Sequence, residues 1–441
     1  MYIAVDDTDS IRGNCTTFLA TEIIRELSSD FDLIGNPRLV RLNPAVPWKT
    51  RGNGSLILHF GKGVGERHLI GKIDRKDIYC YDEGEDVPYE REAVLKRIIP
   101  FMESLHESDA DPGLIVSDER PSYEFYERGL FTIMSVSDVE GELERIGADT
   151  FTIGRGRGLI GSTCGLAWIP EDYTYELLAY RMPDRWGTPR EVDPDSIRDM
   201  DHSYPSTFNS WEDRFDKVAM VPATPCPVLY GLRGDDMEEL IPASEMIRSE
   251  NVYRWVIFLT NQGTDDHIIT EYGSLNPNAS YLVKGVVKEC ARHIRGGHTF
   301  IDIDTEFGTI TCGAYEPSKE FRMAFDRLLP GDVVEVMGEY REDPVTLNVE
   351  KLHVISTVPD VVKVSNPMCQ QCGKRMESVG KGQGYRCKRC HTKTQSAIFE
   401  ENVRWIVPGW YEPPTAARRH LSKPLKRMGM IQPVEFVNRR I

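Results

Sequence analysis

Two cysteine pairs near the C-terminus constrain this 441-residue chain more than any other feature. Cys369-x-x-Cys372 is followed by fourteen residues and then by Cys387-x-x-Cys390. Two such pairs on tight turns offer four thiolates, which make the tetrahedral shell of structural zinc. A closed shell leaves no position for water, so we expect this metal to support a small ribbon domain and not to catalyse. An iron–sulfur centre or a redox dithiol is the less favoured alternative.

The charge of the chain is divided between an acidic body and a basic end. The whole chain carries a formal net charge of −16. Residues 361–441 hold 16 Lys and Arg against 5 Glu, a net +11, which leaves −27 for the first 360 residues. We expect the basic end to meet a polyanion such as RNA, and a basic face that only aids solubility is the alternative.

The compartment follows from the apolar runs and the cysteines. The longest apolar run falls short of the roughly 18 residues that a membrane-spanning helix needs, and MYIAVDDTDS carries acids where a signal peptide carries Lys or Arg. We expect a soluble, cytoplasmic protein without a membrane partner. In that compartment the cysteines outside the ribbon are expected to be mostly small buried apolar groups and not disulfides.

The order of apolar patterns predicts an α/β multidomain chain. A strand at residues 2–5 runs into an acidic loop and then into a helix from residue 16. A strand, a helix and a strand at 228–260 suit a small α+β sandwich. Alternating strands from residue 280, with one helix at 318–329, are typical of an oligonucleotide-binding barrel. The acidic segments 61–91 and 106–125 are expected to be exposed.

The acidic run Asp6, Asp7, Thr8 and Asp9 follows directly after the first strand. Three carboxylates within four residues repel one another unless a cation lies among them. Mg²⁺, held by one or two carboxylates and by nucleotide phosphates, fits such a run. An acidic turn that caps the next helix is the alternative. Thr16, at the start of that helix, is a candidate phosphoryl acceptor, and helix capping is again the alternative.

Two glycine-rich loops carry the cations that such a nucleotide needs. The run GRGRGLIG at 154–161 lacks the ending of a Walker loop, but its glycines let backbone amides close around phosphate. The run PWKTRGNG at 47–54 places two cations beside an aromatic ring. With the acidic run, the two loops resemble a site for a nucleoside triphosphate and Mg²⁺. The phosphate-binding candidates are Lys49, Arg51, Gly154, Arg155, Gly156, Arg157, Gly158 and Gly161.

A second polar run follows the strand that ends near residue 260. Asn261, Gln262, Asp265 and Asp266 lie within six residues. Two amides and two carboxylates could hold a small cationic molecule, and a surface turn explains the same residues equally well.

Several long motifs occur in one order across almost the whole chain: VDDTDS, GNCTT, RLNPAVPWKTRGNGS, GRGRGLIGS, CPVLYGLRG, FLTNQGTDDH and the terminal cysteine pairs. They resemble those of the archaeal tRNA(Ile) 2-agmatinylcytidine synthetase family. The resemblance implies a kinase-like ATP-binding domain at 1–193, a ferredoxin-like domain at 194–274 and an OB fold at 275–360. A zinc ribbon at 361–396 and a basic tail at 397–441 complete the chain.

The resemblance also implies a reaction. ATP activates the C2 oxygen of the wobble cytidine in the second isoleucine tRNA, which has a CAU anticodon. The amine of agmatine then displaces phosphate there, AMP and two phosphates are released, and the modified tRNA decodes AUA as isoleucine. By resemblance, Asp6, Asp7 and Asp9 handle Mg²⁺ and phosphoryl transfer, Thr16 is autophosphorylated, and agmatine binds where residues 261–267 fall. No obligate protein partner is implied.

Two other functions remain open from the residues alone. One is a non-catalytic protein that binds single-stranded nucleic acid through the barrel and the ribbon, and the other is an RNA kinase or ligase that does not use agmatine. The acidic run and the two cationic loops favour an enzyme, because a binding protein has no need of them. Incorporation of agmatine into RNA separates the synthetase from the kinase or ligase.

Overall fold

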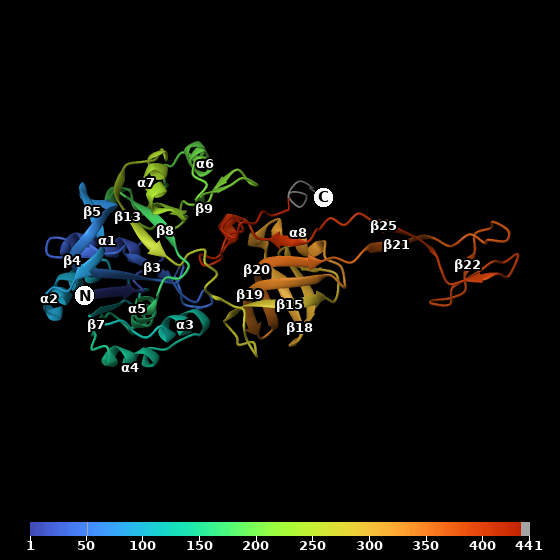
Figure 1. Ribbon diagram of the computed structural model, residues 1–441, viewed down its shortest axis with the longest axis horizontal. Helices are drawn as coiled ribbons and strands as arrows, with labels where there is room; N and C mark the ends of the chain where they lie inside the picture. Colours follow the sequence, from blue (N-terminus) through green and yellow to red (C-terminus); the bar gives the residue numbers. More distant parts are fainter. Residues whose placement is uncertain (51, 434–441) are drawn as a thin grey trace.

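The computed structural model describes residues 1–50 and 52–433, and every structural statement below refers to these residues. The molecule is elongated: a large front body, a barrel and a small ribbon follow one another along its longest axis (Figure 1). Among the described residues, no helix is both long enough and apolar enough to span a membrane.

One mixed sheet of eleven strands forms the front body. Its order is β7–β6–β1–β4–β3–β13–β8–β12–β9, and β2 and β5 pair with each other and with β4. Strand β13 runs parallel to β3 and antiparallel to β4, so the expected kinase-like and ferredoxin-like parts share this sheet. The strands are β1 Tyr2–Asp6, β2 Asp32–Ile34, β3 Arg38–Arg41, β4 Gly54–Ile73, β5 Lys76–Glu85, β6 Gly113–Ser117, β7 Asp149–Thr152, β8 Thr174–Arg181, β9 Thr207–Phe208, β12 Val228–Gly234 and β13 Val252–Thr260.

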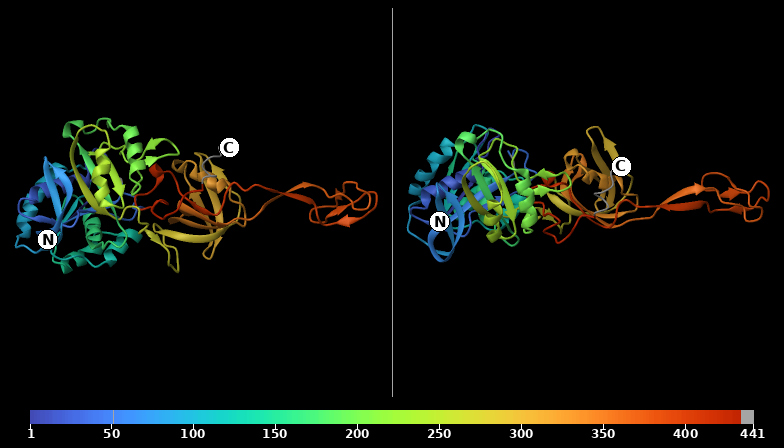
Figure 2. Two further views of the ribbon diagram at one scale, coloured as in Figure 1. Left: turned by 45° about the horizontal axis from the view of Figure 1, so that its top comes forward. Right: turned by 90° about the horizontal axis from the view of Figure 1, so that it is seen from above.

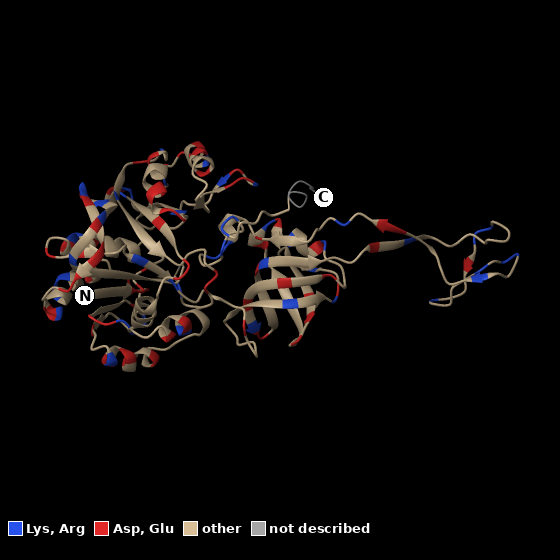
Figure 3. Ribbon diagram, viewed as in Figure 1, with Lys and Arg blue, Asp and Glu red and all other residues tan. Residues whose placement is uncertain are grey.

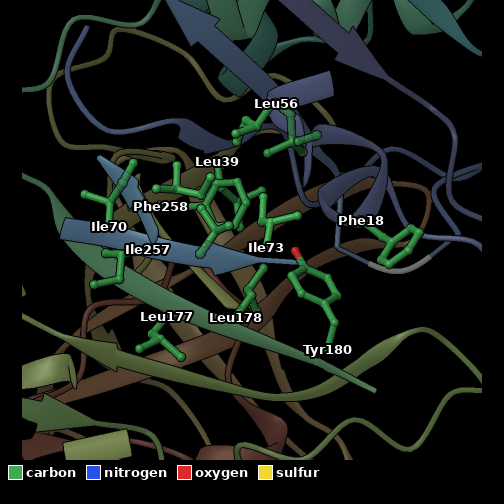
Figure 4. Packing of buried hydrophobic residues seen from close by; sticks show 14 of the residues in the cluster. Phe18, Leu39, Leu56, Ile70, Ile73, Leu177, Leu178, Tyr180, Ile257 and Phe258 are labelled. Carbon is green, nitrogen blue, oxygen red and sulfur yellow. The ribbon is translucent and has the colours of Figure 1, made fainter. Parts of the chain in front are cut away.

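Helices cover both faces of this sheet because alternate strand residues point to opposite sides. Ile3 and Val5 of β1 pack in one core with α1 and α2, whereas Ala4 packs in a second core with α3, α4 and α5. Figure 4 shows the first core, where side chains of β3, β4, β8 and β13 meet. The helices of the front body are α1 Thr16–Leu27, α2 Arg91–Ser104, α3 Glu124–Phe131, α4 Ser137–Arg145, α5 Gly158–Ala167, α6 Pro194–Ser203 and α7 Met237–Glu245.

Five strands close into a barrel after the front body. The order around the barrel is β15–β17–β18–β20–β19 and back to β15; β18 and β20 are parallel, and the other four contacts are antiparallel. The strands are β15 Ser280–Val287, β17 His298–Thr305, β18 Gly308–Ala314, β19 Val333–Glu342 and β20 Val345–Ser356. Helix α8, Phe321–Asp326, is shorter than the expected 318–329, and its two phenylalanines pack in the barrel core.

The ribbon is an insertion. Strands β21 (Asp360–Ser365) and β25 (Ile398–Asn402) pair antiparallel and form a stalk that carries the ribbon away from the barrel (Figures 1 and 2). Asp360 pairs with Asn402, so the chain leaves and returns at one place. The remaining short strands are β10 Trp211–Glu212, β11 Lys217–Val218, β14 Ile268–Ile269, β16 Arg292–Ile294, β22 Glu377–Ser378, β23 Tyr385–Arg386, β24 Lys393–Thr394 and β26 Gly409–Tyr411.

The segment after the stalk returns to the barrel and then to the front body. Strand β26 pairs with β20, and Tyr411 is buried in the barrel core. Further on, Leu421 packs in the second core of the front body beside Trp168. The described part of the expected tail, residues 397–433, is therefore folded; the rest of it lies outside the described residues.

The positive charge of this returning segment is largely balanced within the chain. Arg419 pairs with Glu339 at 2.5 Å, and Arg427 pairs with Asp172 at 2.8 Å. The acids come from distant elements, the barrel and the front body. A sum of charges along the sequence does not reveal such pairs, which is why a basic tail open to RNA was expected here.

The acids of the two flanks are mostly exposed, as expected, but apolar residues of the same segments are buried in strands. Strands β4 and β5 occupy most of 61–91, and every residue of β6 within 106–125 is buried. The acids of the second segment lie beside β6, whose own sequence, GLIVS, is apolar. A central strand covered on both faces needs such a run.

Candidate active site

The predicted loops meet at one cavity beside the end of β1. The cavity has a volume of about 80 Å³. It is lined by the acidic run, the start of α1, the 46–54 loop and the first turn of α5. The predicted site residues on its wall are Asp6, Asp7, Asp9, Thr16, Lys49, Arg157 and Gly161.

The acidic run places negative charge where burial makes it unfavourable. Burial, and after it the neighbouring charge of Asp7, raises the pKa of Asp6 well above its ordinary value. Burial also raises the pKa of Asp7 to about 7, against the opposing effect of Arg157. Asp7 has a positive φ of 56°, and its backbone N–H donates to Oδ1 of Asp6 at 2.7 Å. A bound cation would offset this repulsion.

Two glycines of the 154–161 loop serve close packing. A side chain at Gly161 would place its Cβ 1.6 Å from Oδ2 of Asp6. A Cβ at Gly158 would lie 2.1 Å from the backbone nitrogen of Gly113. The first turn of α5 therefore rests directly on β1 and β6, and no larger residue leaves room for the Asp6 carboxylate.

The rest of this loop surrounds Asp111, a buried residue that sequence reasoning missed. The backbone N–H groups of Arg155 and Gly156 donate to Oδ1 of Asp111 at 2.6 and 2.7 Å, and Nε of Arg157 donates to Oδ2 at 3.0 Å. These amides hold a carboxylate of the chain itself, and Gly154, Arg155, Gly156 and Gly158 do not line the cavity. The sequence signal that could have indicated Asp111 is an acidic residue just before an apolar strand.

The carboxylate of Asp9 contacts Thr16 at the start of α1. Oδ1 of Asp9 accepts hydrogen bonds from the backbone N–H of Thr16 at 2.7 Å and from its hydroxyl at 3.1 Å. Asp9 thus caps the helix, while the Thr16 hydroxyl lines the cavity. A carboxylate beside a hydroxyl is an arrangement that can accept its proton during phosphoryl transfer.

The 46–54 loop forms the rim of the cavity. Lys49 donates from Nζ to the carbonyl oxygen of Pro44, and burial lowers the pKa of its ammonium group. Trp48 is 45% exposed, and the Arg157 guanidinium lies 5.9 Å from its ring centre. Arg51 lies outside the described residues.

Two larger cavities adjoin the first. One of about 300 Å³ shares Asp9 and Thr16 with it and is also lined by Glu176 and His420. The other, of about 560 Å³, lies between the 41–53 loop, the barrel and residues 413–422. Glu176 and His420 come from β8 and from the returning C-terminal segment, and neither belongs to a local motif that sequence reasoning could detect.

The side-chain amides of the 261–267 run form hydrogen bonds with residues that line these cavities. Oδ1 of Asn261 accepts from the backbone N–H of Arg41 at 2.7 Å, and its Nδ2 donates to the carbonyl oxygen of Arg41 at 2.9 Å. Nε2 of Gln262 donates to Glu176 at 2.5 Å, and its Oε1 lies 3.0 Å from Nδ1 of His420. Both amides hold residues that line the 300 Å³ cavity.

The carboxylates of the same run tie parts of the molecule together. Asp265 pairs with the buried Lys351 of the barrel and accepts from the backbone N–H of Lys423 at 2.7 Å. Asp266 accepts from the hydroxyl of Tyr126 at 2.6 Å. Within the described part of the chain, none of the four predicted agmatine residues lines the three cavities above.

The four ribbon cysteines lie together as the spacing predicted. Their Sγ atoms are all within 4.8 Å of one another, and those of Cys372 and Cys387 are 3.6 Å apart. Zinc–sulfur bonds of about 2.3 Å place tetrahedral thiolates about 3.8 Å apart, so the set fits zinc. Most charged residues of the ribbon are Lys or Arg, whereas the stalk carries both acidic and basic residues (Figure 3).

Solved structures of related proteins define the class. The chain is 38% identical to the protein in a complex of TiaS with an isoleucine tRNA and ATP, with a TM-score of 0.83 and 97% of both chains covered. It is 34% identical to the protein in a complex of TiaS with an isoleucine tRNA, AMPCPP and agmatine, with a TM-score of 0.82 and the same coverage. The fold and the site are those of an ATP-dependent enzyme that modifies tRNA.

Sequence comparison specifies the family. The models of the TiaS TCKD domain, the TiaS FLD domain and the TiaS C-terminal zinc ribbon domain match residues 2–155, 156–267 and 366–406. The isoleucine tRNA 2-agmatinylcytidine synthetase TiaS of Archaeoglobus fulgidus is 39% identical over 437 residues, which cover 98% of both chains. That of Methanocaldococcus jannaschii is 36% identical and covers 98% of this chain and 99% of its own. The chain belongs to the TiaS family.

Proposed function

We propose that this chain is an ATP-dependent ligase that joins agmatine to C2 of the wobble cytidine of the second isoleucine tRNA, so that AUA is decoded as isoleucine. The observation that carries the proposal is the single cavity that unites Asp6, Asp7, Asp9 and Thr16. It lies in a chain that matches its named relatives over nearly the full length. A non-catalytic RNA-binding protein has no use for buried carboxylates beside a hydroxyl.

The strand pairings support a finer domain assignment. The barrel has the strand order of an OB fold, with a helix between its third and fourth strands, and we assign 275–360 to that fold. Strand β8 pairs with β12 and β13, so a boundary at 193/194 would divide the ferredoxin-like sheet. We therefore place the end of the kinase-like domain at 155/156, where the family models divide.

The cavity residues suggest separate roles. Asp6, Asp7 and Asp9 would hold Mg²⁺, which neutralises phosphate charge when it is bound. Lys49 and Arg157 line the same wall and would contact the phosphates, as would Arg51. Thr16 is the proposed phosphoryl acceptor. The amides of 154–156 shape the loop through Asp111 and need not touch phosphate.

The 300 Å³ cavity suits agmatine, an elongated dication with a charge at each end. The carboxylates of Asp9 and Glu176 are both on its wall, where Glu176 also pairs with Arg233 at 2.9 Å. Leu39, Leu56 and Leu178 provide an apolar surface for the methylene chain. Its end at Asp9 opens toward the catalytic cavity, where the amine must react. We propose that Asn261 and Gln262 act indirectly, by holding Arg41 and Glu176.

The ribbon suggests a metal and an RNA contact, and the remaining cysteines suggest a compartment. We propose that the ribbon binds one structural zinc and that its Lys and Arg contact the tRNA backbone. Among the described residues, the six cysteines outside the ribbon form no disulfide, which favours a reducing compartment, the cytoplasm.

The decisive experiment is the transfer of radiolabelled agmatine to a transcript of the isoleucine tRNA with the CAU anticodon, in the presence of ATP and Mg²⁺. We expect label in the RNA at the wobble cytidine and none when ATP is omitted. The Glu176→Gln variant should raise the KM for agmatine by about tenfold or more, because a buried charge partner is removed. RNA that becomes phosphorylated or joined without label would replace the proposal by an RNA kinase or ligase.

A further inference from the structure

Trp48 is far more exposed than the other large aromatic side chains near the active site. It lines the catalytic cavity at its rim, and 45% of its surface is exposed. Tyr126 and Trp168, in the core behind the cavity, are almost completely buried. An indole left open beside catalytic carboxylates contributes little to a core, so a role in binding explains it better.

The ring is held in place without being covered. The Arg157 guanidinium lies 5.9 Å from the ring centre of Trp48. Arg157 is itself anchored by Asp111 at 3.0 Å and by Asp7 at 3.5 Å. A cation held over an aromatic ring is attracted to it. The acidic run therefore helps to orient the indole, and the exposed part of the ring remains available to a ligand.

The loop that carries Trp48 borders two adjacent cavities. Val46, Lys49 and Asn53 line both the catalytic cavity and the 560 Å³ cavity on the barrel side. The second cavity lies within the range of roughly 300–1,000 Å³ that is usual for small-ligand sites. Its wall includes Arg341 and Arg419, whose guanidinium groups pair with Glu339 on the same wall. A base that leaves its RNA stack and reaches the catalytic cavity meets Trp48 on its wall.

We propose that Trp48 is the platform on which the extruded wobble cytidine stacks, with its C2 oxygen toward the acidic run. This inference rests on the proposed function, and it assigns Trp48 to the RNA and not to the adenine of ATP. An enzyme that acts on a base must take it out of the stack, and aromatic rings commonly receive unstacked bases. Loss of such a ring weakens binding by roughly 5- to 150-fold.

The first test measures agmatine transfer by the full-length enzyme as a function of tRNA and, separately, of ATP. Trp48→Ala and Trp48→Leu should each raise the KM for tRNA by about tenfold or more and change the KM for ATP less than twofold. Trp48→Phe keeps a ring and should remain within about threefold of the wild type. Phe215→Ala is the matched control, because Phe215 is 39% exposed beside Arg214 at 6.0 Å in the β10–β11 turn.

A second test does not depend on turnover. A tRNA with pyrrolocytidine, a fluorescent cytidine analogue, at the wobble position is mixed with the enzyme without ATP. Stacking on Trp48 should quench the fluorescence, and Trp48→Leu should abolish the quenching whereas Phe215→Ala retains it.

Three results would overturn the assignment. A raised KM for ATP with an unchanged KM for tRNA would mean that Trp48 holds adenine. If Trp48→Leu behaves like the wild type in both tests, Trp48 is only an apolar side chain and does not stack on the base. Quenching that persists in Trp48→Leu would place the base elsewhere. If the wild type transfers no agmatine, the proposed function fails, and the fluorescence still decides the stacking.

Discussion

Replacement of Gly161 by alanine is the sharpest test of how the active site is built. The added Cβ would lie 1.6 Å from Oδ2 of Asp6, whereas real Cβ contacts stay beyond about 3.0 Å. The two groups must therefore separate by about 1.4 Å. Helix α5 cannot retreat freely, because α3 packs closely against it: a Cβ at Gly129 would lie 2.7 Å from Cβ of Cys164. We expect the Asp6 carboxylate to move.

The expected loss of activity follows from that displacement of the Asp6 carboxylate. A shift of about 1 Å in a catalytic group costs on the order of 100-fold in rate. Overpacking of a buried site costs about 1–3 kcal/mol of stability, which a folded chain of this size tolerates. Gly161→Ala should therefore lose roughly 100-fold or more in kcat for agmatine transfer, while it remains folded and retains its affinity for tRNA.

The assay compares agmatine transfer, tRNA binding and thermal unfolding of the variant with those of Gly141→Ala. Gly141 lies within α4, and a Cβ there meets nothing within 4 Å. Alanine is favoured over glycine in a helix by about 1 kcal/mol, so the control should be as active as the wild type and slightly more stable. If Gly161→Ala keeps its activity within about threefold, the close contact between α5 and Asp6 does not position the catalytic carboxylate.

Four further predictions concern other parts of the molecule. Purified protein should contain about one zinc per chain, and Cys387→Ala with Cys390→Ala should lose it and weaken tRNA binding, as elemental analysis and binding assays would show. Asp7→Asn should reduce cytidine modification by orders of magnitude with tRNA affinity almost unchanged; equal loss of both would indicate a damaged fold. With γ-labelled ATP, wild type and Thr16→Ser should become labelled and Thr16→Ala should not, and label retained in Thr16→Ala would exclude that hydroxyl. Burial raises the pKa of Asp201 to about 6, so the folded state keeps a proton that the unfolded chain releases near pH 4, and stability falls as pH rises from about 4 to 6. Asp201→Asn should therefore raise the melting temperature at pH 7.5, by the equivalent of up to about 3 kcal/mol, and not at pH 4.

Features carried by adjacent residues were predictable from the sequence. The four ribbon cysteines come together as their spacing requires, because each pair lies on one turn. The strand, the acidic loop and the helix from Thr16 follow from periodicity, and helix α1 begins at that residue. Local patterns determine which side chains face a core and which loop follows a strand, so they also place Asp6, Asp7 and Asp9 at one strand end.

Tertiary structure decided which distant groups meet these loops. Asp111 holds the glycine loop, and His420 reaches the cavities from beyond the ribbon, although neither stands in a recognisable motif. The ion pairs that neutralise the basic C-terminal segment could likewise not be predicted from the sequence, because Glu339 and Asp172 belong to the barrel and the front body. Such pairs arise when strands far apart in sequence join one sheet or barrel. Periodicity specifies the face on which a side chain lies, but the pairing of strands selects its partner.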